Sequence, residues 1–156
     1  VVEKNYQALS EKANQSKITR SVLPDRKVGP VWYLPGGESS VGLLYKDAHG
    51  MYAYAKDKHS GSLSMPFETV LDKFGQSDFW ILSYRGDFNR AKLLAEFQGY
   101  SMLKPCRTGE IYGCKVDSIP YFEEVSWRPD WLLSDLIQLF HPDLQIAPMR
   151  YYHKLK

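Results

Sequence analysis

Residues 32–50 read Trp-Tyr-Leu-Pro-Gly-Gly-Glu-Ser-Ser-Val-Gly-Leu-Leu-Tyr-Lys-Asp-Ala-His-Gly, which predicts a strand, a glycine turn and a capped helix in succession. Ser39 or Ser40 can accept a hydrogen bond from the first helical turn, and Gly50 closes the helix. The free amides and positive dipole of such a helix start favour an anionic or carbonyl-rich partner. An ordinary strand-to-helix connection in an α/β sheet explains the pattern equally well.

The composition describes one globular domain. The chain has 156 residues, of which 44% are hydrophobic and 24% charged, so it can bury a proper core. Its net charge of +2 carries no basic block, which argues against nucleic acid as a partner. No apolar run is long enough to span a membrane, and the first twenty residues have no signal-like apolar region.

The first residues have the pattern of a helix that has already begun. Residues 3–16 place Tyr6, Leu9 and Ala13 on one face, but no capping residue or turn precedes them. We therefore expect the sequence to be a piece of a longer protein.

The remaining periodicity alternates between strands and helices. Apolar runs predict strands at 18–23, 51–55 and 79–83, the last of them central and parallel, and residues 150–155 are a candidate closing strand. One-face spacing predicts helices at 66–74, 89–98 and 129–140, while 103–106 and 111–115 pair as a hairpin in this interpretation. Residues 57–64 and 116–128 are expected to be irregular. This order predicts an α/β fold with a mainly parallel sheet wound on both faces.

Ligands of wound sheets bind beyond the carboxyl ends of the strands, so the loops that leave strands are the candidate site. Here these loops are 32–40, 56–62, 84–87 and 117–128. They combine aromatic rings with guanidinium groups, which suits a large ligand that is partly aromatic and partly anionic. The residues offered are Trp32, Tyr33, His59, Tyr84, Arg85, Tyr121, Phe122, Trp127 and Arg128.

Signatures of catalysis are absent from the sequence. Residues 37–41 fail the Gly-x-Ser-x-Gly elbow at its last position, and the four histidines lie on separate elements without metal-site spacing. His141 before Pro142 suits a structural cap, and only His59 is considered as a ligand. Glu123 and its neighbouring carboxylates suit a solvated loop better than an acid–base pair, and Arg85 and Arg128 suit surface ion pairs as well as ligand contacts.

The two cysteines, Cys106 and Cys114, do not define a disulfide framework. In the expected hairpin they lie too far apart for a bridge, because the two Cα atoms of a disulfide are roughly 4.4–6.8 Å apart. We therefore favour two unpaired thiols, with a bridge as the alternative.

A family resemblance rests on a series of short motifs in fixed order. They are Trp-Tyr-Leu-Pro-Gly-Gly-Glu-Ser-Ser (32–40), Asp-Ala-His-Gly (47–50), Pro-Phe-Glu-Thr-Val-Leu (66–71), Ser-Asp-Phe-Trp-Ile (77–81), Arg-Pro-Asp-Trp-Leu-Leu-Ser-Asp-Leu (128–136), Phe-His-Pro-Asp-Leu (140–144) and a closing Tyr-Tyr-His-Lys-Leu. The series resembles the second, C-terminal lobe of the helical-backbone (class III) periplasmic substrate-binding proteins. These serve ABC importers for iron-siderophore, haem or cobalamin, and the likeness is nearest to the Bacteroides-type versions.

The resemblance implies a three-layer, Rossmann-like, doubly wound sheet preceded by the end of a long inter-lobe helix. Residues 1–17 would be that helix end and residues 18–156 the C-terminal substrate-binding lobe. A first lobe and a lipoprotein signal would precede them, which places the full-length protein in the periplasm, anchored by lipid. Relatives with a longer glycine and asparagine pattern before the last helix differ from residues 119–126 here, so the identity of the ligand stays open.

The resemblance also implies roles for particular residues. Ligand contacts map to Trp32, Tyr33, Ser39, Tyr84, Arg85, Trp127 and Arg128. Glu38, with Glu123 as the second choice, maps to the docking of the ABC transporter permease. No cofactor and no resident metal are expected.

Three functions follow as hypotheses. The first is a non-catalytic capture module that closes on a ferric siderophore, haem or cobalamin and delivers it to a permease. The alternative is a hydrolase-type enzyme that uses Ser39 or Ser40 in the glycine turn. The third is a scaffold lobe whose aromatic rim meets only protein.

Overall fold

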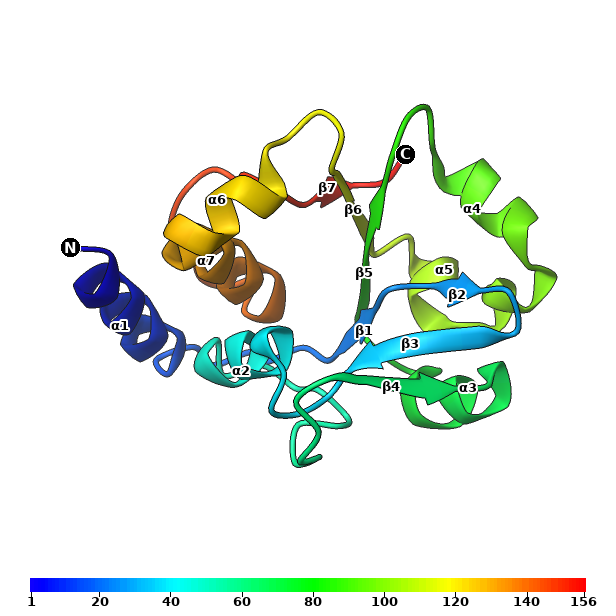
Figure 1. The fold of residues 1–156 in the computed structure, drawn as a ribbon, viewed down its shortest axis with the longest axis horizontal. Helices are drawn as coiled ribbons and strands as arrows, with labels where there is room; N and C mark the ends of the chain where they lie inside the picture. The colour runs from blue at the N-terminus through cyan, green and yellow to red at the C-terminus, as the bar shows by residue number, and fades with distance from the viewer.

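A four-stranded sheet runs through the middle of the molecule, in a computed structural model that describes residues 1–156 (Figure 1). Its order is β1 (Val22–Pro24), β5 (Phe79–Tyr84), β6 (Ile111–Lys115) and β7 (His153–Lys154). The first three strands are parallel and β7 is antiparallel to β6. Met51 forms a parallel bridge to Ser21. This architecture confirms the predicted α/β class with its mainly parallel sheet.

β5 is central because both of its faces are covered. Its first four residues are buried. Phe79 packs against Phe140 with ring centroids 5.3 Å apart, while Trp80 on the opposite face lies 5.0 Å from Tyr100 and 5.8 Å from Trp32. The continuous apolar run therefore marks a strand buried on both sides, as predicted.

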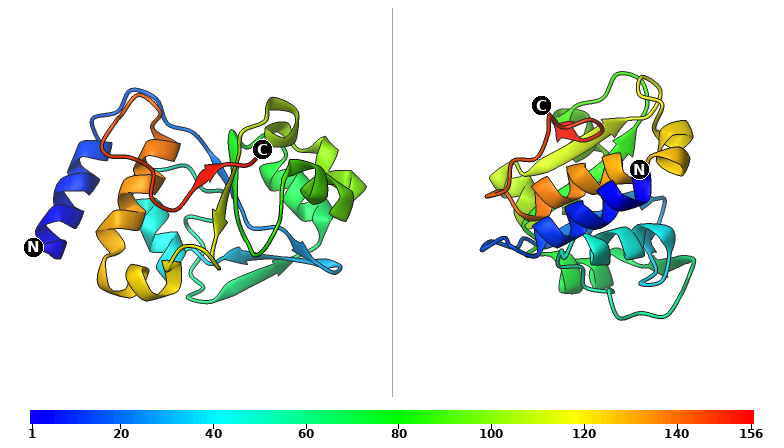
Figure 2. Two further views of the ribbon diagram at one scale, coloured as in Figure 1. Left: turned by 90° about the horizontal axis from the view of Figure 1, so that it is seen from above. Right: turned by 90° about the vertical axis from the view of Figure 1, so that its left-hand side faces the viewer.

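Helices lie on both sides of this sheet (Figure 1). One side carries α1 (Val2–Ala13), α2 (Ser40–Asp47), α6 (Tyr121–Trp127) and α7 (Pro129–Phe140), and the other α4 (Arg90–Glu96), the 3₁₀ helix η1 (Gln98–Met102) and α5 (Lys104–Thr108). Both views in Figure 2 show α1 beside α7. The two are joined by a hydrogen bond of 2.6 Å from Asn5 Nδ2 to Asp130 Oδ2. None of these helices has the length and apolar character needed to cross a membrane.

A second, antiparallel sheet contains the strand that opens the decisive stretch. It consists of β2 (Lys27–Val28), β3 (Val31–Pro35) and β4 (Ser62–Met65) in that order, and α3 (Phe67–Phe74) follows it. Gly29 at φ 61° and Pro30 form the two-residue turn between β2 and β3. The expectation that residues 31–34 join the wound sheet is therefore wrong, because this turn gives them an antiparallel partner. β4 also lies where residues 57–64 were expected to be a loop.

Three further local expectations are wrong. The expected hairpin at 103–115 is α5 followed by β6, because Pro105 suits the first turn of a helix and Gly109 ends it at φ 81°. In the expected strand 51–55 only Met51 pairs, and the tyrosines that follow pack into the core, where Tyr52 lies 5.9 Å from Phe74. Within 116–128, which was expected to be irregular, α6 forms.

Two side-chain expectations are confirmed. Cys106 and Cys114 are free thiols, and both are buried. His141 is buried at the end of α7, where its ring nitrogens lie 2.8 Å from the carbonyl oxygens of Ile18 and Ala48. It ties the chain before β1 to the end of α2, which is a structural role.

Candidate functional site

The glycine turn before α2 packs directly against the chain at 57–61. Gly36 N donates to Gly61 O and Glu38 N to His59 O. A Cβ atom at Gly36 or Gly37 would overlap the carbonyl oxygens of His59 or Asp57, so glycine is required by this close approach. The turn is therefore a backbone junction that fixes where α2 begins.

Ser39 is the cap of α2. Its Oγ accepts a hydrogen bond of 3.0 Å from Gly42 N and donates one of 2.6 Å to Gly36 O. Both capacities of the hydroxyl are used to hold the turn, as the capping pattern in the sequence predicted.

A hollow of about 570 Å³ opens in front of this turn, at the carboxyl ends of β1 and β5. In the sheet, β1 lies between Met51 on one side and β5 on the other. The chain runs from β1 to Met51 and then crosses back to β5, so the direction of winding changes at β1. Such a switch point is the usual ligand crevice of wound sheets. The polar side chains that line the hollow are Asp25, Arg26, Tyr33, Ser39, Ser40, Ser60, Ser62 and Ser83.

A smaller hollow of about 190 Å³ continues from it between the sheet, α6 and α7. The two share Asp25, Val41 and Ser83. The wall of the smaller hollow is mostly apolar, with the phenols of Tyr45, Tyr121 and Tyr152 and the thiol of Cys114.

A third hollow of about 940 Å³ lies between α1, α2 and α6. It shares Ser40 with the first, and Trp127, which is 81% exposed, forms part of its wall. The start of α2 at Ser40 and Val41 thus borders all three hollows. We call the first two the larger and the smaller hollow, this one the third hollow, and the three together the α2 groove.

Asp25 is the charged side chain without an ion-pair partner at the first two hollows. It directly follows β1 in the left-handed region at φ 66°, and its carboxylate makes no ion pair or side-chain hydrogen bond. Although solvent reaches Asp25, it sits in a concave site, and the desolvation by surrounding protein raises its pKa to about 6, against a smaller lowering by Arg26. Burial also raises the pKa of Tyr121 to about 12 and that of Tyr45 and Tyr152 well above the ordinary value, so these phenols are neutral.

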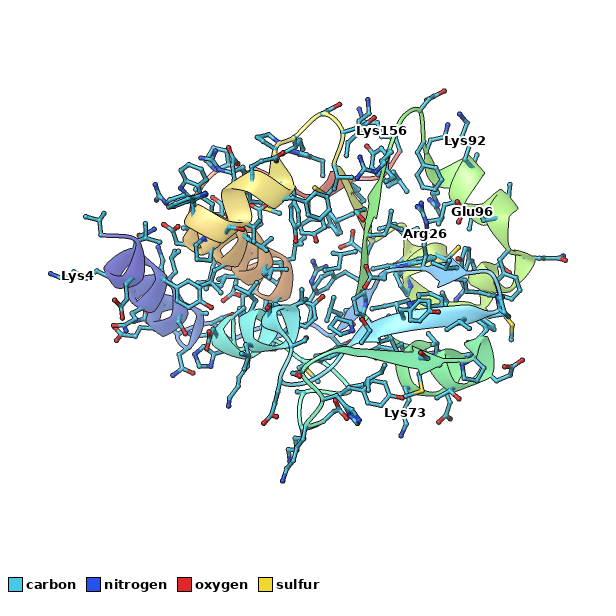
Figure 3. All side chains as sticks on the ribbon, in the orientation of Figure 1. Lys4, Arg26, Lys73, Lys92, Glu96 and Lys156 are labelled. Atoms are coloured by element: carbon cyan, nitrogen blue, oxygen red, sulfur yellow. The ribbon has the colours of Figure 1, made fainter.

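Arg26, the other charged residue at the larger hollow, directs its charge elsewhere. Its guanidinium lies 4.6 Å over the Phe88 ring, and its Nε is 3.6 Å from Glu96 Oε1. Figure 3 shows Arg26 and Glu96 beside each other at α4, on the far side of β5 from α2. Of the two charges at the larger hollow, that of Arg26 is therefore offset in part by Glu96, while Asp25 has no ion-pair partner.

The structure brings together only some of the predicted ligand contacts. Tyr33, 47% exposed, and Ser39 line the larger hollow. Trp32 has no exposed surface, and its Nε1 donates to Pro24 O at 2.9 Å, so its placement on the rim is wrong. Alternation along β3 explains this, because neighbouring residues of a strand face opposite sides.

The remaining predicted contacts lie away from the larger hollow. Tyr84 packs on Phe88 at 5.5 Å, and Arg85 is exposed in the following loop. Trp127 borders the third hollow. Arg128 forms two hydrogen bonds of 2.8 and 3.0 Å to Asp130, which has no exposed surface, so its guanidinium has a structural partner.

The two predicted docking residues are both exposed. Glu38 lies in the glycine turn and Glu123 in the first turn of α6, and neither is in an ion pair. His59, which was considered as a ligand, lies 2.7 Å from Asp57 through its Nδ1 at the same junction. No group of three or more His, Cys, Asp or Glu side chains is placed to hold a metal ion.

The sequence interpretation missed Asp25 and Ser83. Asp25 directly follows β1 and Ser83 is the residue before the last of β5, but β1 was expected to end at residue 23 and Asp25 was assigned to a polar connection. The sequence feature that could have indicated Asp25 is Val-Leu-Pro-Asp at 22–25, an apolar run that ends at a carboxylate.

No protein-family model matches the sequence, and no curated protein matches it. Solved structures do match. A TroA-like periplasmic binding protein FepB from Veillonella parvula aligns with 91% of this chain and 45% of its own at a TM-score of 0.63 and 17% identity. The periplasmic haem-binding protein RhuT from Roseiflexus sp. RS-1 aligns with 92% of this chain and 54% of its own, at a TM-score of 0.66 and 18% identity.

The chain has the fold of TroA-like periplasmic binding proteins. An ABC-type Fe³⁺-hydroxamate transport protein from Saccharomonospora viridis shares it over 70% of this chain and 37% of its own, at a TM-score of 0.54 and 19% identity. The chain spans about half the length of the solved structures that it matches.

Proposed function

We propose that this chain is part of a solute-binding protein of an ABC importer, located in the periplasm and held to the membrane by a lipid anchor elsewhere in the protein. The observation that supports this function is the α2 groove, which lies at the switch point of a sheet with the fold of TroA-like binding proteins. Those proteins are described as binders of iron compounds, a hydroxamate or haem. The ligand proposed here is a metal chelate of that class, with cobalamin as a further candidate.

In this proposal the groove binds a ligand and catalyses no reaction. Exposed rings at Tyr33 and Trp127 can pack on a bulky guest, and the hydroxyl-rich wall between them can hydrogen-bond to its oxygen atoms. A second lobe would supply much of the contact area and would close over the groove.

Titration of the full-length protein with a ferric hydroxamate, haemin and cobalamin tests this proposal. We expect at least one chelate to bind and the substitution Trp127→Ala to weaken it roughly tenfold, since aromatic packing is worth about 1 kcal/mol or more. Met102→Ala changes another exposed apolar side chain, on η1 outside the groove, and should leave the affinity unchanged. If no chelate binds the full-length protein, the proposal is wrong.

Glu38 and Glu123 remain the proposed docking residues for the permease. Both are exposed and unpaired next to the groove, because Ser39 and Phe122 beside them line it. Neutralising either with glutamine should lower the ATPase stimulation of the reconstituted transporter, while chelate affinity stays the same.

The alternative, a hydrolase that uses Ser39 or Ser40, has less support. The Ser39 hydroxyl is engaged by Gly36 and Gly42 rather than by a general base. A screen for turnover of esters and phosphates, repeated with Ser40→Ala, separates the two functions, since a capture protein shows no turnover.

A further inference from the structure

The chemistry of the larger hollow narrows the class of chelate. Five serine residues from four segments line it: Ser39 and Ser40 at the start of α2, Ser60, Ser62 on β4, and Ser83 on β5. The Ser39 hydroxyl is engaged by Gly36 O and Gly42 N, so four serine hydroxyls and the phenol of Tyr33 face the hollow without such partners. Hydroxyl groups both donate and accept hydrogen bonds, so this wall fits an oxygen-rich guest better than an apolar macrocycle.

The wall carries one carboxylate and one guanidinium, Asp25 and Arg26, and only Arg26 has an ion-pair partner in the protein. The Arg26 guanidinium lies 3.6 Å from Glu96 and over the Phe88 ring, and its Nη1 is buried without a hydrogen-bond partner, whereas the exposed Asp25 carboxylate is the charged group of this wall that has no ion-pair partner. The Asp25 side chain has no hydrogen-bond partner, and it lies where the larger and the smaller hollow meet. A carboxylate in such a concave site is stabilised by a cationic donor and repels an anion.

We infer that the α2 groove selects a ferric chelate that carries a protonated amine, and that Asp25 is the residue that recognises this amine. The inference rests on the proposed function and specifies its ligand. It disfavours haem, whose carboxylates would meet the charge of Asp25, and it assigns the hydroxyl-lined wall to the oxygen atoms around the iron.

The ionisation of Asp25 controls the charge that the hollow offers to a guest, because the groups that face Asp25 keep their charge state in the same pH range. Arg26 is adjacent and remains charged, while Tyr45, Tyr52, Tyr121 and Tyr152 from the surrounding elements remain neutral below pH 9, because their pKa values are raised. Burial raises the pKa of Cys114 to about 12, so its thiol is neutral as well. Selection for a cation should therefore be full at pH 7.5 and decline as the pH falls through about 6.

The experiment compares two forms of one chelate on the full-length protein. Ferrioxamine B is a ferric trihydroxamate with a free ammonium group, and N-acetylation makes it neutral without changing the iron site. We expect the ammonium form to bind about tenfold more tightly at pH 7.5, as a charge-assisted contact predicts, and this ratio to fall toward one at pH 5.

The matched variant is Asp25→Asn, because asparagine keeps the size and also tolerates the left-handed backbone at this position. It should remove the preference while the acetylated form still binds, and Asp72→Asn on α3 should retain the preference. Equal affinity of the two forms for the unmodified protein, or an unchanged ratio in Asp25→Asn, overturns the inference. Binding of haemin or cobalamin with neither ferrioxamine form overturns it too but leaves the proposed function intact, whereas binding of no chelate removes both.

Discussion

At the scale of single residues, Arg128 was a predicted ligand contact, and the fold uses it as a partner of Asp130. The buried Asp130 carboxylate accepts two hydrogen bonds from Arg128 and one from Asn5 of α1, and the Arg128 hydrogen bond lowers its pKa, with desolvation opposing this. We expect Asp130→Ala to lower the free energy of unfolding by about 2 kcal/mol, as for other hydrogen bonds to charged groups. Urea denaturation at pH 7 measures this.

The control is Asp87→Ala, which removes a carboxylate whose ion pair with Lys92 is exposed, and it should leave the stability unchanged within error. A lowered pKa means that the Asp130 contribution is present above the pKa of the unfolded chain and is lost as the pH falls through the folded pKa. The difference in the free energy of unfolding between Asp130→Ala and Asp87→Ala should therefore shrink as the pH falls. Equal effects of both substitutions at pH 7 would contradict the structural role.

Residue-level prediction from the sequence succeeded where a local rule decides the outcome. The Ser39 cap and the structural role of His141 follow from short-range pattern. The free cysteines were predicted correctly but from a hairpin that does not form, since Cys106 lies in α5 and Cys114 in β6. Prediction failed for Trp32, whose side of β3 is decided by the partner strands and the core, and these are distant in sequence. Asp25 was missed for a related reason, since only the three-dimensional sheet shows that β1 ends beside β5.

At the scale of elements, α2 is held by its first turn. Ser39→Ala removes the hydrogen bond to Gly42 N and the one to Gly36 O, so it should destabilise the protein by about 1 kcal/mol, as loss of a helix cap does. Ser40→Ala, one residue later and exposed, should have little effect on the midpoint of thermal unfolding. If Ser40→Ala lowered the midpoint of thermal unfolding more than Ser39→Ala, Ser40 rather than Ser39 would be the cap.

The elements that the sequence predicted well are those with strong internal periodicity. α2, α3, α4, α7 and β5 all lie where one-face spacing or a continuous apolar run placed them. The elements that were missed are short: β2, β4, α5 and α6 have two to seven residues. A run as short as β2, β4 or α5 has no period of its own, so tertiary pairing decides its state.

At the scale of the whole molecule, three hollows meet at the start of α2. Ser40 joins the first and third hollows, and Asp25, Val41 and Ser83 join the first and second. Tyr33 on β3 and Trp127 on α6 line the first and the third of these hollows. A guest as large as a ferric chelate is expected to cover both residues.

Thiol labelling of the full-length protein tests whether one guest covers the groove. The native thiols give a low background, because Cys106 and Cys114 are buried and desolvation raises the pKa of both. Tyr33→Cys and Trp127→Cys should react readily with a maleimide and become at least severalfold slower when a saturating ferric chelate is added. Lys73→Cys on α3, which Figure 3 shows at the lower edge of the molecule, should react at the same rate throughout. Protection at only one of the two positions would confine the ligand to one hollow and contradict this expectation.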